Sequence, residues 1–425
     1  MHSLLVFLPS FVYFAKSIEF LIFYNLLLFT FFFFLSKNNF LRKDLFYNKK
    51  NLFFFTIIIY ISFQILPISE EIIEIISPKS YYYYKNIDNG HNLFFISLNP
   101  LLTIKFLTIY LNLFLLFLIT TGLIYSKKDL RQILFYSFIL SFLHVVYGLI
   151  ALSNGSILYF YNKLDLDILS GFFINRNHYS FFLVLIFVLC IYYINLYNKY
   201  FATKFESKWL GFILSDIFLI RVFLILVSIS IILTKSRTGN ITFIFLILLI
   251  LFFEFNKFKK LTFLSKILIT ILFLDVLVIG SIIGFDQVIS RLYMIPLDGG
   301  INRFDIFHFG LSSFLEFPFF GYGLGNFETI FRLEFGSYSF LYDHVHNDFI
   351  ELMGELGVIG FIILIAFFIK LYLIYIKSLL PFKEIILLSF FSALFHANFD
   401  FILHMPQILS LMVFLISLLN CKIKT

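Results

Sequence analysis

The sequence has little charge and almost no cysteine for its length. Only 13% of its 425 residues are Asp, Glu, Lys or Arg, whereas 61% are hydrophobic. So few charged side chains cannot cover a water-soluble surface, which excludes a soluble globular protein and predicts a polytopic membrane protein. The two cysteines, Cys190 and Cys421, form no CxxC pair and have no metal-ligand spacing. A disulfide framework and a cysteine metal centre are therefore not expected.

Long apolar runs fill most of the chain. A helix needs roughly 17 to 25 apolar residues to cross about 30 Å of hydrocarbon. Twelve candidate runs occur, of which the first is short: 3 to 15, 18 to 36, 51 to 68, 100 to 126, 133 to 152, 178 to 197, 215 to 234, 239 to 256, 266 to 284, 349 to 376, 384 to 400 and 406 to 421. All should be helical, because lipid offers no partner to an unpaired backbone amide. We therefore predict an all-α transmembrane helical bundle of about twelve spans, in which residues 1–425 form a single integral-membrane domain.

The basic residues between the runs predict the orientation. Alternate segments that lie on one side of the membrane hold 19 of the 32 Lys and Arg residues: 37 to 50, 127 to 132, 198 to 214, 256 to 266, 377 to 383 and 422 to 425. By the positive-inside rule this side is cytoplasmic, so both termini should lie in the cytoplasm. The net charge of +7 is thus explained by topology. The basic clusters of the chain are short and lie beside membrane spans, which argues against nucleic acid as a partner.

The unusual polar residues gather on the opposite side, which we expect to face the periplasm. The longest loop there, 285–348, lies between the ninth and tenth spans. It contains the glycine-rich stretch Gly321 to Gly325 and ends in the polar cluster Asp343 to Asp348. Titratable groups of this density are costly at a membrane boundary and indicate chemistry. We predict that the loop folds over the membrane mouth, with a short helix near Phe304 to Phe317, and carries part of the active site.

Four motifs occur in order on this side of the membrane. They are Gly171-Phe-Phe-Ile-Asn175-Arg176-Asn177-His178-Tyr179-Ser180, Ser236-Arg237-Thr238-Gly239, Arg303 followed by Pro318-Phe-Phe-Gly321-Tyr-Gly323-Leu-Gly325-Asn326-Phe327, and His346-Asn347-Asp348-Phe349-Ile350-Glu351 through Glu355-Leu356-Gly357-Val358-Ile359-Gly360. Taken together, they resemble the O-antigen ligase and polymerase superfamily of bacterial membrane glycosyltransferases. The resemblance spans roughly Gly171 to Gly360.

The resemblance implies transfer of a glycan from an undecaprenyl pyrophosphate carrier to an acceptor hydroxyl at the periplasmic face. It implies no metal and no other cofactor, and the conserved arginines and histidine of the family correspond to Arg237, Arg303 and His346. Ligases use the lipid A core as acceptor and polymerases use a second carrier-linked glycan, a choice that the sequence leaves open. A transporter of lipid-linked sugars is a more distant alternative, but it would favour repeated halves and ionisable groups deep in the bundle.

The residue chemistry points to the same reaction without the family. A pyrophosphate leaving group develops negative charge, which a divalent metal or a set of cations must neutralise. The outer segments contain no histidine cluster with ligand spacing, and we expect arginine to take the place of a metal. The arginine guanidinium stays protonated and can donate two parallel hydrogen bonds to phosphate oxygens. The candidates are Arg237 and Arg303, with Arg176 as a third; for each, a snorkelling or surface arginine is the alternative.

His346 is the candidate general base, because imidazole titrates near neutrality and the acceptor hydroxyl must lose its proton during attack. We expect it to begin a helix, whose N-terminal dipole disfavours the imidazolium. His344 is the rival base, but only His346 directly precedes the Asn-Asp helix start. Direct displacement with this base inverts the anomeric configuration.

Other residues support this candidate site. Asn347, Glu351 and Glu355 recur every four residues, so they should form a polar stripe that faces the protein interior. Glu351 either orients a catalytic group or binds sugar hydroxyls, or it is a buried carboxylate satisfied by its neighbours. His178 lies at the mouth of another span, near the pyrophosphate or as an interfacial aromatic.

Two further patterns have competing explanations. The glycines of the stretch Gly321 to Gly325 do not match a phosphate-binding loop, because no Lys-Ser/Thr follows them, and we expect them to allow a tight turn. The run Tyr81 to Tyr84 either stacks on sugar rings or forms an aromatic belt at the bilayer surface.

Overall fold

The computed structural model describes residues 1–12, 15–41, 49–87, 93–154, 168–201, 216–260, 262–278, 303–335 and 342–421. This part of the chain is helical and contains no β-strand. Its elements are α1 (His2–Phe7), η1 (Leu8–Phe11), α2 (Ile18–Lys37), α3 (Lys49–Gln64), α4 (Glu70–Ile76), α5 (Pro78–Ile87), α6 (Pro100–Leu123), α7 (Lys127–Asn154), α8 (Arg176–Phe201), α10 (Asp216–Leu233), α11 (Arg237–Phe258), α12 (Phe263–Val278), α14 (Arg303–Glu316), α15 (Phe327–Phe335), α16 (Asp348–Lys377), α17 (Lys383–His396), η4 (Ile402–His404) and α18 (Pro406–Leu419).

Six of the described helices are long and apolar enough to cross a membrane: α2, α6, α7, α8, α11 and α16. Shorter apolar helices accompany them, among them α10 and α18. The predicted all-α membrane fold is therefore confirmed in its class. Each of the twelve predicted runs overlaps a helix, and the predicted loop helix coincides with α14. Residues 285–302 and 336–341 of the predicted large loop lie outside the described residues.

The N-terminal run does not form one continuous helix. It consists of α1 and the 3-10 turn η1, which contains Pro9 near its start. Proline has no backbone N–H, so it suits the first turn of a new element and not the interior of a continuing helix. The side chains of Leu5, Val6 and Phe7 are buried. The first residues therefore belong to the core of the protein, packed against α7 and α18.

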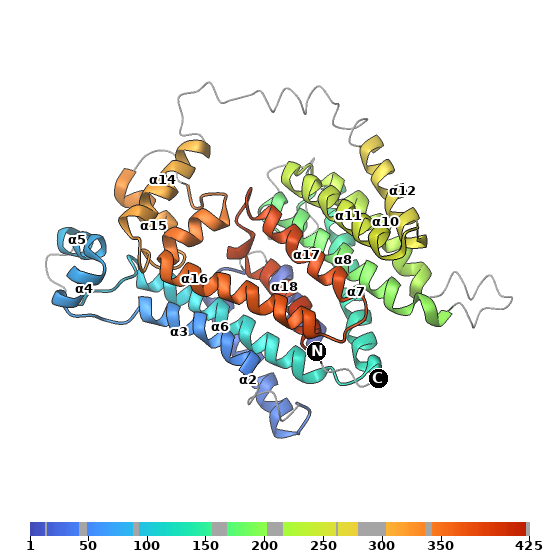
Figure 1. Ribbon diagram of the computed structural model, residues 1–425, viewed down its shortest axis with the longest axis horizontal. Coiled ribbons are helices and arrows are strands. Elements are labelled where there is room, and N and C mark those ends of the chain that lie inside the picture. Colours follow the sequence, from blue (N-terminus) through green and yellow to red (C-terminus); the bar gives the residue numbers. More distant parts are fainter. Residues whose placement is uncertain are drawn as a thin grey trace.

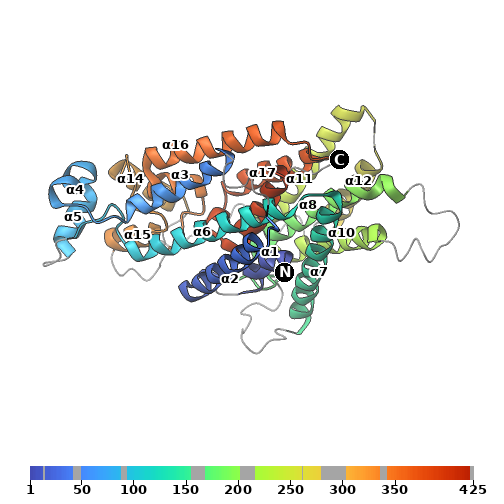
Figure 2. The ribbon, with the colours of Figure 1, turned by 90° about the horizontal axis from the view of Figure 1, so that it is seen from below.

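The long helices form two neighbouring groups. In Figures 1 and 2, α3, α6 and α16 run side by side, and the pair α4 and α5 projects from one end of this group. In the second group α8 contacts α10, α11, α17 and α18. The side chains from Phe181 to Ile194 of α8 are all buried. These buried side chains and the four neighbouring helices make α8 the central helix of this group.

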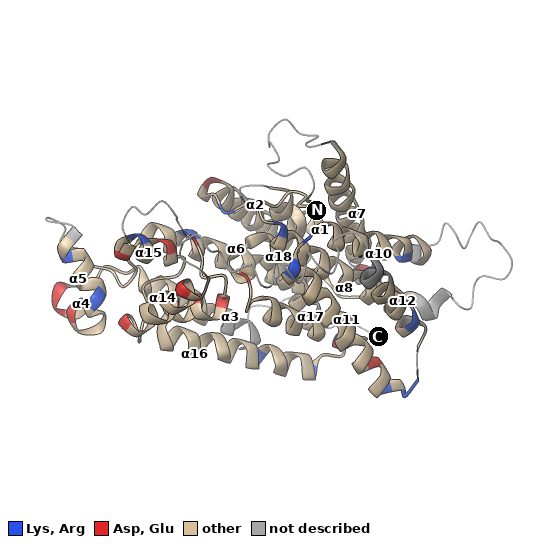
Figure 3. Cartoon of the chain, turned by 90° about the horizontal axis from the view of Figure 1, so that it is seen from above, with Lys and Arg blue, Asp and Glu red and all other residues tan. Residues whose placement is uncertain are grey.

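Charged residues gather on the short helices at one end of the molecule, α4, α5, α14 and α15, whereas the long helices are mostly uncharged (Figure 3). A small hydrophobic cluster, which includes Phe317, Tyr322, Phe331 and Val345, joins α14 and α15 to the start of α16. Through this cluster, the described part of the large loop packs against the polar segment that precedes α16.

Helix α16 is interrupted at Gly357, where the backbone has φ 63° and ψ −177°. This conformation is accessible almost only to glycine, and it breaks the helical hydrogen bonds on both sides. The loop residues before α15 replace them. Val358 N–H donates to the carbonyl of Pro318 at 2.8 Å, and Gly323 N–H donates to the carbonyl of Glu355 at 3.1 Å.

The glycine-rich stretch makes this docking possible. Gly321, Gly323 and Gly325 all have positive φ angles, which confirms the predicted tight turn. A Cβ atom at Gly321 would lie 2.2 Å from the carbonyl oxygen of Glu355, so only glycine allows the two backbones to approach. The third and fourth sequence motifs therefore form a single structural unit.

Candidate active site

The polar segment before α16 is a tight turn and not the first turn of the helix. Asn347 is the N-cap residue, and its side-chain oxygen accepts hydrogen bonds from Phe349 N–H and Ile350 N–H. His346 precedes the cap with a left-handed φ of 58°. The expectation that His346 begins the helix is therefore wrong by two residues, because the asparagine side chain is the better cap. Asn347 accordingly caps the helix and does not belong to its buried stripe.

The nearest polar partner of the His346 ring is Asp400, which lies in the connection between α17 and η4. The distance from His346 Nδ1 to Asp400 Oδ1 is 3.3 Å, and the carboxylate is fully buried. Burial raises the pKa of Asp400, but the proximity of His178 and His346 outweighs burial and places it below its usual range. An anionic Asp400 keeps the proton of His346 on Nδ1, which leaves Nε2 as an acceptor.

His344 lies deeper, between an acid and an amine. Its Nδ1 lies 2.6 Å from Glu351 Oε1, and its Nε2 lies 3.2 Å from Lys16 Nζ. The geometry assigns the proton to Nδ1, which donates to the carboxylate, while Nε2 accepts from the ammonium group. Burial, together with the positive charges of Lys16 and His404, lowers the pKa of His344 well below its usual value. Both ring nitrogens of this rival base are thus occupied.

His404 joins three carboxylates of α16. Its Nδ1 lies 2.7 Å from Asp348 Oδ1, and its Nε2 lies 3.0 Å from Glu355 Oε2 and 3.6 Å from Glu351 Oε1. Burial lowers the pKa of His404, but these carboxylates outweigh burial and raise it well above its usual value. Carboxylate oxygens at both ring nitrogens favour the imidazolium form. The predicted interior position of Glu351 and Glu355 is confirmed, and this cation is their partner.

Three of these side chains have the geometry of a cation site. The ligand atoms of His344, Glu351 and His404 all lie within 4.8 Å of one another. This group could not be found from sequence spacing, because His404 is far from His344 and Glu351 in the sequence. Lys16 already supplies a positive charge beside this group. A metal ion would have to displace the protons that His344 and His404 now donate to carboxylates.

Phe401 connects the histidines. Its ring centre lies 3.8 Å from that of His344, 4.5 Å from that of His178 and 5.1 Å from that of His346. Lys16 Nζ lies 5.4 Å from the same centre. The predicted residues His178, His344 and His346 are therefore brought together around one aromatic ring.

The first two motifs meet where α8 and α11 begin. Ser236 caps α11 and also donates a hydrogen bond to Asn177 Oδ1 at 2.7 Å. A Cβ atom at Gly239 would lie 1.7 Å from Ser180 Oγ, so the glycine lets the two helices touch. Arg176 and Arg237 are consequently the first residues of adjacent helices. Arg237 is exposed and Arg176 is half-buried.

Arg303 is the first residue of α14, and its side chain lies outside the described residues. The helix itself packs on the site: a Cβ atom at Gly310 would lie 2.8 Å from Ile350 and 3.3 Å from Val345. The backbone of α14 is thus adjacent to the turn that carries His344 and His346.

Sequence reasoning missed Lys16, Asp400, Phe401 and His404. Asp400 and His404 do have a signal in the sequence, because they are titratable residues at the boundary between the last two predicted spans. The polar cluster Asp343 to Asp348 has the same kind of position, directly before the tenth span. That signal was not used. Nothing in the sequence indicated a role for Lys16 except its position after the short apolar run 3 to 15.

The fold and the site define a class, an integral membrane protein whose buried acids and histidines converge at the start of one helix. Residues 222–365 match the family described as O-Antigen ligase. This match covers the second, third and fourth motifs and confirms the resemblance to the O-antigen ligase and polymerase superfamily. The match and the apolar helices together support an integral membrane enzyme of the O-antigen ligase or polymerase type. No curated protein matches the chain.

Proposed function

We propose that the protein is an O-antigen ligase-like glycosyltransferase that moves a glycan from undecaprenyl pyrophosphate to a hydroxyl of the lipid A core. The observation that carries this proposal is the His346–Asp400 pair at 3.3 Å. The His346 side chain is 23% exposed, so its second nitrogen can meet a substrate. The reaction takes place at the periplasmic face, and both chain termini are cytoplasmic.

His346 acts as the general base. The acceptor hydroxyl gives its proton to Nε2 while its oxygen forms a bond to the anomeric carbon of the donor. The bond from that carbon to the pyrophosphate oxygen breaks, and its electron pair leaves with the pyrophosphate. The single displacement inverts the anomeric configuration, and Asp400 stabilises the imidazolium that forms.

The leaving pyrophosphate binds to arginines at helix starts. Arg176 and Arg237 begin adjacent helices, and Arg303 begins α14. Each guanidinium can donate two hydrogen bonds to phosphate, and the free N–H groups of a helix N-terminus favour the same anion. Developing negative charge is thus neutralised without a metal, and activity should survive excess EDTA. A strict need for Mg²⁺ or Mn²⁺ would contradict this part of the proposal.

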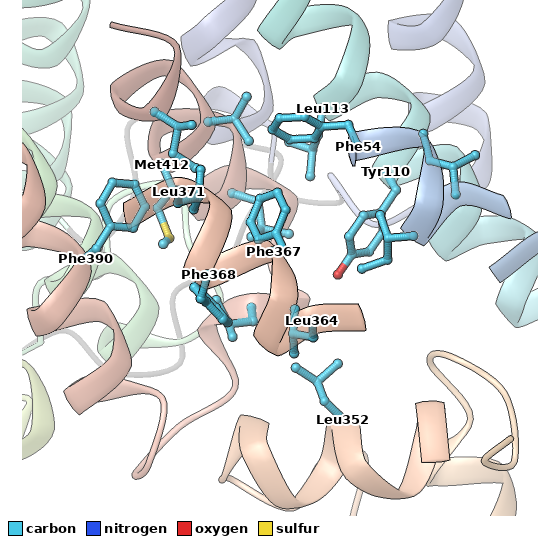
Figure 4. Close-up of a pocket in the computed structure, with 16 residues that line it drawn as sticks. Phe54, Tyr110, Leu113, Leu352, Leu364, Phe367, Phe368, Leu371, Phe390 and Met412 are labelled. Atoms are coloured by element: carbon cyan, nitrogen blue, oxygen red, sulfur yellow. The ribbon is translucent and has the colours of Figure 1, made fainter. Parts of the chain in front are cut away.

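The carrier tail requires an apolar path, and two adjoining cavities beside α16 fit that need. One of about 90 Å³ is lined by residues such as Phe54, Tyr110 and Leu364 (Figure 4). It shares Phe368 and Phe390 with a second cavity of about 320 Å³. Their linings are aliphatic and aromatic, which suits an isoprenoid chain.

Replacement of the base tests the proposal. His346→Ala should lower transfer by about 10²- to 10⁴-fold in a reconstituted assay with unchanged membrane insertion, because the general base is lost. Full activity of His346→Ala would reject the assignment. A polysaccharide polymerase with the same donor chemistry is the alternative. Gene deletion separates the two, because loss of all capped lipopolysaccharide indicates a ligase and single-repeat capping indicates a polymerase.

A further inference from the structure

A cleft of about 540 Å³ lies outside the site described above. One wall is formed by α4 and α5, from Ile75 to Lys79 and at Tyr82. The other wall is the end of α14 with the segment that follows it, from Leu315 to Phe320. In Figure 1 these elements lie at the end of the molecule from which α4 and α5 project.

The lining is mostly apolar, with exposed Ile75 and Leu315, and it also contains two exposed rings and the charged residues Lys79 and Glu316. Tyr82 and Phe319 are 57% and 63% exposed. Beside them Lys79 Nζ lies 3.1 Å from Glu316 Oε2 and 3.7 Å from Glu334 Oε1. An acyl chain in the cleft would remove water from this partly exposed ion pair and would offer it no further hydrogen bond, which is costly. Sugar hydroxyls can bond to the amine and the carboxylates, while sugar C–H groups pack on the aromatic faces. The chemistry of the lining therefore favours a carbohydrate.

The position of the cleft along α14 indicates which carbohydrate. The helix begins at Arg303, passes Val345 at Gly310 and ends at Glu316 in the cleft. At 1.5 Å per residue, Gly310 is about 10 Å from the first residue and about 9 Å from the last. The proposed phosphate ligand, the turn with the base and the cleft thus follow one another in a line. With the pyrophosphate at Arg303, as proposed above, the cleft lies at the opposite end of α14 from the leaving group.

The wall that carries Phe319 is held firmly. The carbonyl of Phe319 accepts a hydrogen bond from Ile359 N–H at 3.2 Å, and that of Pro318 accepts from Val358 N–H. Both donors belong to α16, the helix that directly follows His346. The aromatic face and the base are therefore mounted on one element, which is the requirement for a binding subsite that orients a substrate.

We propose that this cleft binds the acceptor oligosaccharide, at sugars some distance from the one that carries the attacking hydroxyl. The proposal rests on the glycosyltransferase function proposed above. The cleft residues determine acceptor affinity and do not take part in the chemistry.

The test is the double variant Tyr82→Ala/Phe319→Ala of the full chain in lipid nanodiscs. Its matched control is Tyr136→Ala/Phe273→Ala, which removes rings that are 58% and 62% exposed on α7 and α12. With the lipid A core as acceptor, the cleft variant should raise the acceptor KM about tenfold, because two stacking contacts are lost. The turnover number and the donor KM should not change, and the control should behave as the unmodified protein.

A second measurement separates this proposal from the proposed function. The lipid-free oligosaccharide released from lipopolysaccharide by mild acid should bind to the unmodified protein in titration calorimetry without donor, and binding should be lost in the cleft variant. If the unmodified protein transfers no glycan yet binds this probe through the cleft, the proposed function fails and the cleft stands. An unchanged acceptor KM, or a rise in the donor KM instead, would overturn the cleft proposal.

Two milder changes cover the case in which the double variant does not fold. Tyr82→Leu and Phe319→Leu retain apolar volume and remove only the ring. Each should still raise the acceptor KM, and unchanged kinetics in both would also overturn the proposal.

Discussion

Among the described histidines around Phe401, His346 has the most accessible side chain. Its side chain is 23% exposed, compared with 10% for His344 and 2% for His178. His344 is also bonded at both ring nitrogens. The preference for His346 as the base thus has a physical reason beyond its place in the sequence: a proton acceptor needs a free lone pair that a substrate can reach.

The role of Asp400 leads to a prediction at this scale. Asp400→Asn should lower the turnover number about 10²-fold, because the neutral amide neither fixes the His346 tautomer nor stabilises the imidazolium. Steady-state transfer kinetics measure this effect. The exposed residue Asp343 in the same segment provides the control, and Asp343→Asn should retain activity. Equal activity of both variants would remove Asp400 from the mechanism.

Lys16 predicts a pH dependence of stability. Burial lowers the pKa of Lys16 from 10.5 to about 8, although nearby carboxylates oppose the shift. Between these two pH values the unfolded chain binds more protons than the folded one, so stability rises with pH. The cost of the buried charge is fully present below about pH 8.

Lys16→Met removes this titration. From pH 8 to 10.5 the melting temperature of the unmodified protein should therefore rise relative to that of the variant. Thermal unfolding in detergent at several pH values measures both melting temperatures. The control is Lys37→Met, at an exposed residue of α2. Parallel curves for the unmodified protein and Lys16→Met would show that the pKa of Lys16 is not lowered in the folded protein.

At the scale of elements, the break in α16 joins the large loop to the membrane helices. Tyr60 and Gln64 of α3 complete the junction, since both side chains donate to the carbonyl of Phe320. The break thus binds together α3, α16 and the segment before α15. The turn with His346 and the cleft beside Phe319 depend on the same junction.

Gly357→Ala should disrupt this junction. A Cβ atom there would lie 2.4 Å from the Phe319 carbonyl oxygen, and the backbone conformation itself is unfavourable for alanine. We expect a destabilisation of about 1–3 kcal/mol from the backbone alone. A lower melting temperature and reduced transfer measure it, with the exposed neighbour Val358→Ala as control. An unchanged melting temperature would mean that the helix is not broken at this residue.

At the scale of the whole molecule, the distribution of basic residues predicts the orientation. Cys190 and Cys421 are both buried, so an introduced cysteine can be labelled against a low background. Tyr82→Cys should react with a membrane-impermeant maleimide in intact spheroplasts, because the predicted orientation places α5 outside the membrane. Lys259→Cys, at the end of α11, should react only after the membrane is opened. The reverse pattern would invert the proposed topology and place the site in the cytoplasm.

Sequence reasoning reached the helices more completely than the site. Runs of apolar residues predicted α6 and α16 nearly to their ends, because hydropathy is a local property. Helical spacing also predicted the buried positions of Glu351 and Glu355, whereas the role of His346 stays a prediction. Sequence reasoning placed His346 in the helix itself, because the competition between His346 and Asn347 for the cap is decided by backbone geometry.

The sequence by itself determined that the protein lies in a membrane, where its helices begin and end within a few residues, and which four motifs carry the family resemblance. Only the tertiary structure decided that Asp400 lies beside His346 and that His404 lies among the acids of α16. Only the tertiary structure likewise decided that Lys16, near the start of the chain, contacts His344. The reason is that hydropathy and helical spacing are set by neighbours in sequence, whereas the partner of a buried charge is set by which helices pack together.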